Sequence, residues 1–420
     1  MKYFGTDGIR GNAVNTFTQN LLKKIGKAIC LFYKKHNLKP VLLVGNDGRC
    51  SCHHILSGLC SVLLNHGVEV HNVGLCSTPC LAHIGNKFNY PLTIMITASH
   101  NQNYDNGIKF FSCGQKLESH LQAEIEQFMD KPLKQKIVYA KLQSCEHLKE
   151  TYVNYLLKLK HNNFPCILDG ANGGASAILK QVFPLNKKFN VNPNGTNINL
   201  NSGSTCIEVL QAECRKHKIT GFAFDGDADR IIAVSPNGNV VDGDQILFIL
   251  SKILLHTGDN CIGTIISNYG LEKSLKKQNI NFIRTKIGDR FIVQEMKKKG
   301  ANLGGEQCGH IIINPLTKTS DGVLTAIVLT NILSSTNLSL DELLFDYFPH
   351  HQATKNLPLN KPLIDHENLK LLNKKFENEQ AKMIITPSGT ENILRLFVEH
   401  KNKEKAEKTL KKLENFIKNM

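Results

Sequence analysis

Short apolar runs alternate with segments of helical periodicity along most of the chain. In the N-terminal part they predict strands at 41–45, 68–73, 92–96 and 107–111, and helices at 17–35 and 51–65. Strands separated by helices are typical of an α/β unit with a largely parallel sheet. We expect this first unit to occupy residues 1–145.

The same alternation returns twice. The second round has expected strands at 166–168 and 221–224 around a helix that ends near 182, and we place it at 146–246. The third, placed at 247–354, has expected strands at 262–266 and 281–286 and helices at 270–277 and 290–298. The pattern therefore predicts three similar α/β units in series.

The character of the chain changes from about Leu357. Prolines precede a Lys-rich and Asn-rich segment that we expect to be helical, and strands at 383–386 and 393–399 lead to a terminal helix from Asn402. This pattern predicts a small α+β unit at 355–420. The predicted fold class is α/β, with three α/β units and a smaller C-terminal unit.

Composition narrows the class of protein. The chain has 420 residues, more than the about 250 to 300 at which one core stops growing. No apolar run approaches the roughly 20 residues of a membrane helix. The N-terminus also lacks the apolar segment of a secretory signal. We expect a cytoplasmic protein without membrane contact.

The 13 cysteines form no regular framework, so we expect reduced thiols. Cys50, Cys52, His53 and His54 form a local cluster that could bind zinc, but no second ligand pair follows at finger-like spacing. We favour a helix start with small buried thiols.

The net charge of +15 suggests a nucleic-acid partner, because clustered Lys and Arg neutralise phosphate backbones. Only seven of the 51 basic residues are arginine, however, and the lysines are scattered. No recognition motif accompanies them. We therefore expect no nucleic-acid partner.

The most informative segment follows the apolar run at 92–96. Residues 97–109 set the hydroxyl of Ser99 among an imidazole, carboxamides, a carboxylate and the ammonium of Lys109. Ligands of parallel α/β sheets bind where buried strands end in such loops, so we predict a reactive site at Ser99. For His100, a purely structural role is as good an interpretation as a role in catalysis.

A second polar loop lies between two apolar stretches. Asp225, Asp227 and Asp229 alternate with small residues, and Arg230 follows. Three carboxylates at this spacing can converge on one hard ion, and we predict Mg²⁺. The alternative is a polar turn, which we disfavour because three carboxylates beside one arginine repel one another.

The predicted Mg²⁺ site favours phosphoryl transfer at Ser99, which lacks the Gly-x-Ser-x-Gly setting of an acyl-transfer serine. A phosphoserine would supply a further oxygen ligand. Lys109 and His100 are candidates for general acid and base, and Arg10 for stabilising phosphoryl charge.

Two further loops supply candidates for substrate binding. Glu306 and His310 lie in a Gly-rich loop that suits sugar hydroxyls or an amine, with a structural hairpin as the alternative. Residues 387–391 form a hydroxyl-rich turn near Arg395, which suits phosphate, although the turn is a weak motif by itself.

Taken together, the chain resembles the α-D-phosphohexomutase superfamily, most closely its bacterial phosphoglucosamine mutases. The motifs that carry this resemblance run in order from end to end: 4–11, the Ser99 loop, 225–230, 288–290, 305–310 and 387–391. The resemblance implies a four-domain, heart-shaped enzyme with its active cleft at the centre.

The resemblance also implies roles for individual residues. Ser99 would be the phosphoserine and would hold Mg²⁺ with Asp225, Asp227 and Asp229, while Arg10, Lys109 and His100 would assist transfer. The implied substrate contacts are Arg230, Asp289, Arg290, Glu306, Cys308, His310, Ser388, Gly389, Thr390 and Arg395.

The implied reaction interconverts glucosamine 6-phosphate and glucosamine 1-phosphate, for amino-sugar and cell-wall precursor synthesis. Glucosamine 1,6-bisphosphate would be primer and intermediate, and the hexosamine phosphate the small-molecule partner. The oligomeric state stays open, with a homodimer as one option.

Several positions depart from the family pattern. Thr386 stands where arginine is usual, and Cys308 where serine is usual, so both lose polar contacts. Asn46, Gln102 and Asn392 also differ. Two alternative functions remain: a phosphomannomutase or phosphoglucomutase, and a sugar-phosphate binder without turnover.

Overall fold

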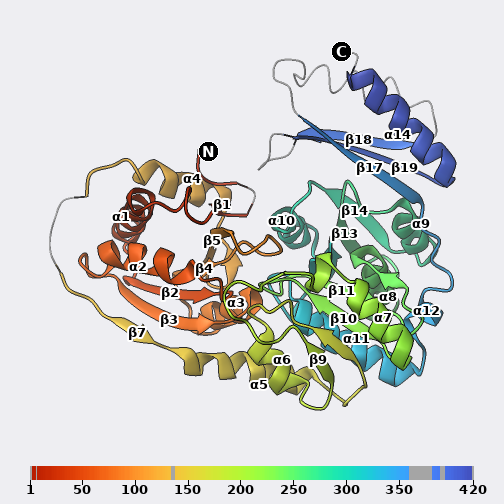
Figure 1. Cartoon of the computed structure of the whole chain (residues 1–420), viewed down its shortest axis with the longest axis horizontal. Coiled ribbons are helices and arrows are strands. Elements are labelled where there is room, and N and C mark those ends of the chain that lie inside the picture. Colours follow the sequence, from red (N-terminus) through yellow and green to blue (C-terminus); the bar gives the residue numbers. More distant parts are fainter. Residues whose placement is uncertain (1, 6, 134–137, 359–380, 388–392, 419–420) are drawn as a thin grey trace.

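The computed structural model of the chain describes residues 2–5, 7–133, 138–358, 381–387 and 393–418. Within these ranges the strands form four sheets, three in α/β units and one in a smaller C-terminal unit, as the fold-class prediction states. Figure 1 shows the N-terminal unit on one side of the molecule and the C-terminal unit at the top of the other. The unit boundaries after residues 145, 246 and 354 stay predictions.

The first sheet is built on the apolar runs at 41–45 and 92–96. β4 (Leu92–Ile96) is buried at every position and pairs in parallel with β2 (Val41–Asn46). The strand order is β1-β5-β4-β2-β3-β7, and β6 pairs with β5. The other elements are β1 (Ile9–Asn12), α1 (Gln19–Lys35), α2 (Cys52–Leu63), β3 (Glu69–Leu75), α3 (Thr78–Lys87), β5 (Asp105–Ser112), β6 (Gln115–Lys116), α4 (Ser119–Phe128) and β7 (Leu142–Ser144).

The second sheet has the order β12-β11-β10-β8-β9. Its unit contains η1 (Glu146–Leu148), α5 (Lys149–Leu159), β8 (Ile167–Asp169), α6 (Ser176–Val182), β9 (Lys187–Phe189), η2 (Gly203–Thr205), α7 (Glu208–His217), β10 (Gly221–Phe224), β11 (Ile231–Val234) and β12 (Val240–Val241).

The third sheet has the order β14-β13-β15-β16. Its unit contains α8 (Gly243–Leu254), β13 (Asn260–Thr264), α9 (Tyr269–Lys277), β14 (Asn281–Thr285), α10 (Asp289–Lys299), β15 (Leu303–Gly305), β16 (Ile311–Ile313), α11 (Gly322–Thr336) and α12 (Leu340–Leu343). A capping box at Asp242 and Gln245 starts α8, because each side chain accepts a hydrogen bond from the backbone of the other.

The three units share the position of one loop. In each sheet, one of the parallel strands is followed along the chain by a strand that pairs with it in antiparallel: β5 pairs with β4, β11 with β10, and β16 with β15. The connections within these pairs are the Ser99 loop, the Asp225 loop and the Glu306 loop. Three sequence motifs therefore occupy equivalent places in three sheets.

A continuous apolar core joins the first three units. One cluster of buried side chains includes Leu43 on β2, Phe222 on β10 and Leu324 on α11, and a second cluster packs α1 and α2 on the N-terminal sheet. Burial of this extent is the main stabilising contribution to the assembled units.

The C-terminal unit has its own small core, centred on Leu394 and Leu413. It consists of β17 (His351–Pro358), β18 (Lys382–Pro387), β19 (Ile393–His400) and α14 (Lys403–Lys418), with the strand order β17-β19-β18. Polar contacts link it to the third unit. Glu399 accepts from the Tyr269 N–H at 2.5 Å, and Lys382 Nζ donates to the Ser267 carbonyl at 3.1 Å.

All cysteines lie in the described ranges and are free thiols. Cys52 is buried at the start of α2, and the His54 ring contacts the Phe17 carbonyl at 3.0 Å, so this local cluster is the start of a helix.

Across the described residues, no helix is both long and apolar enough to span a bilayer.

The predicted strands at 92–96 and 221–224 coincide with β4 and β10. The sequence does not predict β17, because the segment His351–Pro358 carries few apolar residues and is held by its pairing with β19. The Lys-rich and Asn-rich helix expected in this unit falls largely on 359–380, outside the described residues.

We predict that Tyr152→Phe destabilises the fold by about 1–3 kcal/mol, because a buried carboxylate loses a donor. The Tyr152 hydroxyl on α5 donates to both oxygens of Asp321, at 2.9 and 2.8 Å, and Asp321 caps α11. Thermal unfolding measures the effect. Tyr139→Phe is the control, since Tyr139 is 82% exposed.

The loss of stability caused by Tyr152→Phe should depend on pH. Burial raises the pKa of Asp321 to about 6, so the carboxyl binds its proton more tightly in the folded than in the unfolded chain. Stability therefore falls as pH rises from about 4 to about 6, and the ionised form then needs the hydroxyl most. A Tyr152→Phe effect equal at pH 5 and pH 8 would contradict this assignment.

Candidate active site

Ser99 lies in the loop between β4 and β5 and is fully buried. Its φ of +56° is in the left-handed region, which a serine adopts when its surroundings hold it there. Its N–H donates to Thr97 Oγ1 at 2.8 Å, and its Oγ donates to Asp225 Oδ2 at 2.6 Å. The predicted reactive hydroxyl therefore points at the predicted metal-binding loop.

Arg49 holds this loop, although sequence analysis did not select it as a site residue. Asp47 Oδ2 accepts from Arg49 Nε at 2.9 Å and from Thr97 Oγ1 at 2.6 Å, and Asn199 Nδ2 donates to the Ser99 carbonyl at 2.8 Å. The Arg49 guanidinium also donates to the main-chain carbonyls of Ser99, Asn101, Gln102 and Asp105. An arginine beside a glycine in a lysine-biased chain is the signal that could have found it.

Asp225, Asp227 and Asp229 are buried, and their carboxylates bring one oxygen each within 4.8 Å of the others. Burial, reinforced by Asp229 and Asp227, raises the pKa of Asp225 to about 7. Asp227 Oδ1 is buried and has no hydrogen-bond partner among the described residues. A set of oxygen ligands with an unused acceptor suits Mg²⁺, so these residues fit the predicted ion.

The Lys109 ammonium balances these carboxylates. Its Nζ lies 2.6 Å from Asp227 Oδ2, 2.7 Å from Asp229 Oδ2 and 3.2 Å from Asp7 Oδ2. Burial alone would lower the pKa of Lys109, but the three carboxylates outweigh it and hold that pKa well above its usual range. Lys109 is therefore charged, and its role as general acid or base stays a prediction.

Asp7 links the N-terminal motif to this cluster. It accepts from Arg10 Nη2 and from Lys116 Nζ, and Lys116 Nζ also donates to Asp289 Oδ1 at 2.7 Å. Arg10 Nε and two nitrogens of Arg290 are buried without hydrogen-bond partners among the described residues. Guanidinium N–H groups without a partner can donate hydrogen bonds to the oxygens of a phosphate.

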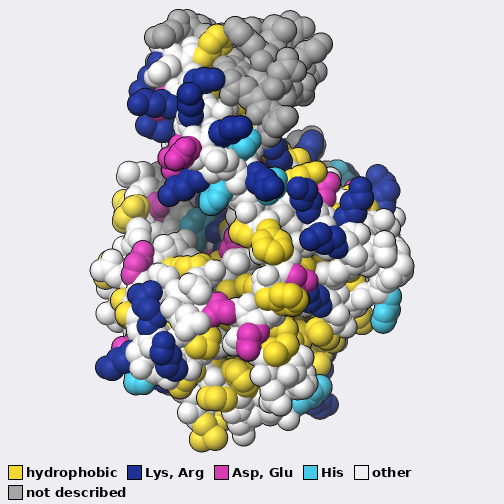
Figure 2. All heavy atoms as spheres, turned by 90° about the vertical axis from the view of Figure 1, so that its right-hand side faces the viewer, with side chains coloured by type: hydrophobic (Ala, Val, Ile, Leu, Met, Phe, Trp, Pro, Cys, Tyr) yellow, Lys and Arg dark blue, Asp and Glu magenta, His cyan; other side chains and the backbone are white. Residues whose placement is uncertain are grey.

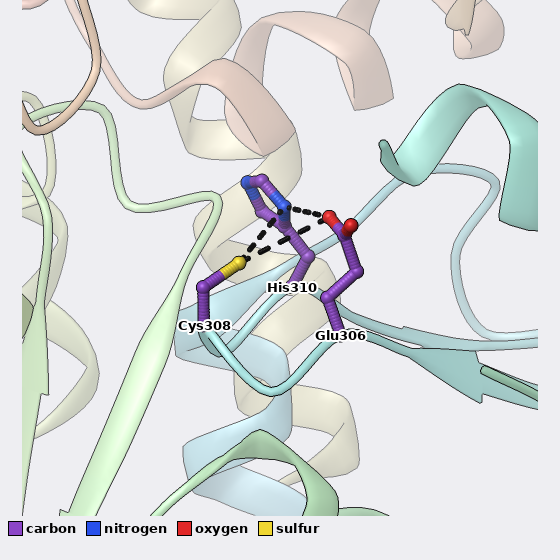
Figure 3. A group of neighbouring side chains, drawn as sticks. All are labelled: Glu306, Cys308 and His310. Carbon is purple, nitrogen blue, oxygen red and sulfur yellow. Dashed lines mark hydrogen bonds and ion pairs between the residues drawn. The ribbon is translucent and has the colours of Figure 1, made fainter. Parts of the chain in front are cut away.

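The Glu306 loop forms a tight turn between β15 and β16. The Glu306 carbonyl accepts from the Gly309 N–H at 2.9 Å, and Gly309 has a φ of +99°, which favours glycine. Figure 3 shows the side chains of Glu306, Cys308 and His310 facing one another. His310 Nδ1 lies 2.7 Å from Glu306 Oε2, and Cys308 Sγ lies 3.7 Å from His310 Nδ1.

His310 joins this loop to the carboxylates. Its Nε2 lies 3.1 Å from Asp229 Oδ1 and 3.1 Å from Arg230 Nε. Two donors cannot bond to each other, so a protonated Nε2 pairs with the carboxylate. Burial lowers the pKa of His310, but Asp229 outweighs it and holds that pKa well above its usual range. The Arg230 N–H donates to Asp225 Oδ1 at 3.1 Å.

His100 lies at the edge of the cluster. Its Nδ1 is 3.5 Å from Ser99 Oγ, at the limit of hydrogen bonding. Burial, with the charges of Arg230 and Arg10, lowers the pKa of His100 to about 3, so its ring is neutral. A neutral imidazole can accept a proton, but the predicted role of His100 is untested.

The predicted phosphate-binding residues Ser388, Gly389 and Thr390 lie outside the described residues, as does Asn392. Arg395 lies on β19, directly across from Thr386 on β18. The roles of these residues stay predictions.

The molecule also has a cavity away from these residues. It has a volume of about 790 Å³, lies between α9 and the start of the C-terminal unit, and is lined by Lys273, Lys276, Lys277, Lys401 and Phe348, among others. Figure 2 shows Lys and Arg side chains gathered near the junction with the C-terminal unit, and acidic and hydrophobic side chains mixed over the body. The predicted catalytic residues do not line this cavity.

Comparison with known proteins places this arrangement in a family. The family model described as "Phosphoglucomutase/phosphomannomutase, alpha/beta/alpha domain I" matches residues 1–136, and that for domain III matches residues 242–350. The phosphoglucosamine mutases of Pediococcus pentosaceus and Bacillus subtilis are 39% and 38% identical to the chain, over 96% of this chain and 95% of theirs.

Solved structures show the same fold. A phosphoglucomutase/phosphomannomutase family protein from Burkholderia thailandensis has a TM-score of 0.81 at 19% identity, covering 99% of this chain and 96% of its own. Aspergillus fumigatus N-acetylphosphoglucosamine mutase, solved with GlcNAc-6P and magnesium, has a TM-score of 0.69 at 15% identity, covering 99% and 95%. The chain therefore belongs to the phosphoglucosamine mutase family of the α-D-phosphohexomutase superfamily.

Proposed function

We propose that this chain interconverts glucosamine 6-phosphate and glucosamine 1-phosphate, with Ser99 as the residue that carries the phosphate. The observation that carries the proposal is the buried Ser99 Oγ, 2.6 Å from Asp225 Oδ2 and beside a group of three carboxylates. Relatives 39% and 38% identical bear the name of this activity.

In the first transfer, the bond between phosphorus and Ser99 Oγ breaks and a new bond forms to the C1 hydroxyl oxygen of glucosamine 6-phosphate. That hydroxyl gives its proton to a base, for which we propose His100, and Ser99 Oγ gains a proton. A dianionic phosphoserine would raise the low proton affinity of His100. The product is glucosamine 1,6-bisphosphate.

In the second transfer, the bisphosphate has turned within the cleft. The bond between phosphorus and the C6 oxygen breaks, Ser99 Oγ gives up its proton and accepts the phosphoryl group, and the C6 oxygen gains a proton. Glucosamine 1-phosphate leaves, and the enzyme is phosphorylated again. We propose the bisphosphate as the primer that first phosphorylates Ser99.

Asp225, Asp227 and Asp229 would hold Mg²⁺ together with the phosphoserine. The bound ion supplies charge neutralisation to the transferring phosphoryl group. Lys109 now neutralises Asp227 and Asp229 at 2.6 and 2.7 Å. A dication on the same carboxylates would weaken that attraction and free the ammonium to interact with phosphoryl oxygens.

The remaining site residues would bind the substrate. Glu306 and His310 would contact the sugar, and the unpaired nitrogens of Arg10 and Arg290 would contact phosphate. We further propose that Arg230 and Asp289 line the same cleft and that the C-terminal unit anchors the non-reacting phosphate through Ser388, Gly389, Thr390 and Arg395.

The test is an isomerase assay with glucosamine 6-phosphate, Mg²⁺ and catalytic bisphosphate. We expect Ser99→Ala to reduce turnover to the rate without enzyme, since no oxygen is left to carry the phosphate. Intact-mass measurement should show one phosphate on the wild type and none on Ser99→Ala. EDTA should abolish turnover, and added Mg²⁺ should restore it.

Mannose and glucose phosphates serve as competing substrates. A higher kcat/KM for either neutral sugar would overturn the assignment to glucosamine. Tight binding of hexosamine phosphates by the primed wild type without any isomerisation would instead identify a binding protein.

Arg49→Lys should lower kcat about 10- to 100-fold, because a lysine cannot hold four loop carbonyls and Ser99 then loses its alignment. The measurement is kcat with wild type and variant at saturating substrate. Arg215→Lys is the control, since Arg215 is exposed on α7. Equal kcat values for Arg49→Lys and Arg215→Lys would show that the contacts of Arg49 with the Ser99 loop have no catalytic importance.

A further inference from the structure

We propose that Glu306, Cys308 and His310 form a second metal site in this chain, separate from the three aspartates and selective for a borderline-soft divalent ion such as Zn²⁺. The three side chains converge at the turn between β15 and β16, as Figure 3 shows. Binding of the ion requires only these side chains, whereas its effect on catalysis rests on the proposed function.

The ligand atoms stand close to the spacing of tetrahedral coordination. Cys308 Sγ is 3.7 Å from His310 Nδ1 and 3.9 Å from Glu306 Oε2, while Nδ1 and Oε2 are 2.7 Å apart. In a tetrahedral zinc site with the usual bond lengths, two ligand atoms lie roughly 3.4–3.6 Å apart. The two distances from Cys308 Sγ agree with this range within a few tenths of an ångström. The shorter distance, between Nδ1 and Oε2, is a hydrogen bond, and it lengthens when the ion replaces its proton.

Neighbouring groups already orient two of the ligands. The Gly288 N–H donates to Glu306 Oε1 at 2.8 Å, which leaves Oε2 directed at the other two ligands. His310 Nε2 lies 3.1 Å from Asp229 Oδ1, so its other nitrogen, Nδ1, faces the proposed ion. A carboxylate behind a ligating histidine is a common feature of zinc sites.

The donor set determines which ion binds. Thiolate and imidazole favour Zn²⁺ over Mg²⁺, whereas a set of carboxylates favours Mg²⁺. Cys308 is exposed, whereas Glu306 and His310 are buried. An ion can therefore reach Cys308 from solvent and then bind the two buried ligands. Three protein ligands leave a fourth position for water.

Another grouping, of Asp229, Asp289 and His310, also converges in the structure. Its carboxylates are already paired, Asp229 with Lys109 at 2.7 Å and Asp289 with Lys116 at 2.7 Å. The Nδ1 side of His310 is therefore the better position for a second ion.

An ion at this site would take Glu306 and His310 away from the sugar. Zn²⁺ should then inhibit the enzyme even when Mg²⁺ saturates the three aspartates, and a chelator followed by Mg²⁺ should reverse the inhibition. Cys308 makes the site specific to thiol-seeking ions, since a hydroxyl at this position is a much weaker ligand.

The binding test uses the full-length chain, stripped with EDTA and returned to excess Mg²⁺, without sugar. Added Co²⁺ should bind once per chain with a thiolate-to-cobalt charge-transfer band, and Zn²⁺ should displace it. Cys308→Ser should remove the band and weaken Zn²⁺ binding, measured by equilibrium dialysis, by at least about tenfold. Glu306→Gln should weaken binding while the band of the bound fraction persists.

Cys50→Ser is the matched control, because Cys50 is also exposed and lies beside His53 and His54. It should leave cobalt and zinc binding unchanged. Loss of the band in Cys50→Ser but not in Cys308→Ser would overturn the proposal. So would zinc binding that disappears in Asp225→Asn and persists in Cys308→Ser. If binding holds but the isomerase assay fails, the proposed function alone is wrong.

Discussion

Beside the apolar core that joins the first three units, a buried ammonium among carboxylates constrains how the first two units meet. Lys109 extends from β5 of the first sheet to Asp227 and Asp229 after β10 of the second. Removing one partner of such a buried pair typically costs about 3–5 kcal/mol, because an uncompensated charge is left behind. The cluster is therefore stable only when both units are in place, and the fold itself supplies a cation before any metal does.

The recurring loop position explains why the predicted site residues of three units lie close together. In each of the first three sheets, the turn into an antiparallel strand carries predicted site residues. Two of these turns hold a non-glycine residue at positive φ, Ser99 at +56° and Ala228 at +54°, and the third holds Gly309 at +99°. Arg49 and Asn199 hold the first of them by bonding to the Ser99 carbonyl. Strained backbone at a site requires this kind of support from its surroundings.

The sequence predicts the α/β class, eight of the sixteen strands described in the first three units, and the residues that lie within local motifs. Ser99 and Asp225 could be found because each motif is contiguous, and the structure brings them to 2.6 Å. Lys116 could not be assigned, because its partner is distant in the chain: Lys116 meets Asp289, 173 positions away. Such pairs depend on how sheets pack, which periodicity does not encode.

The C-terminal unit keeps its apolar core apart from the core that joins the other three. Its links to the body described above are polar and involve Ser267 and Tyr269 near the start of α9. Domains generally fold as they leave the ribosome, N-terminal first. The core that joins the first three units ends at Tyr347, so every buried residue that packs these units together has been synthesised before the ribosome reaches the C-terminal unit.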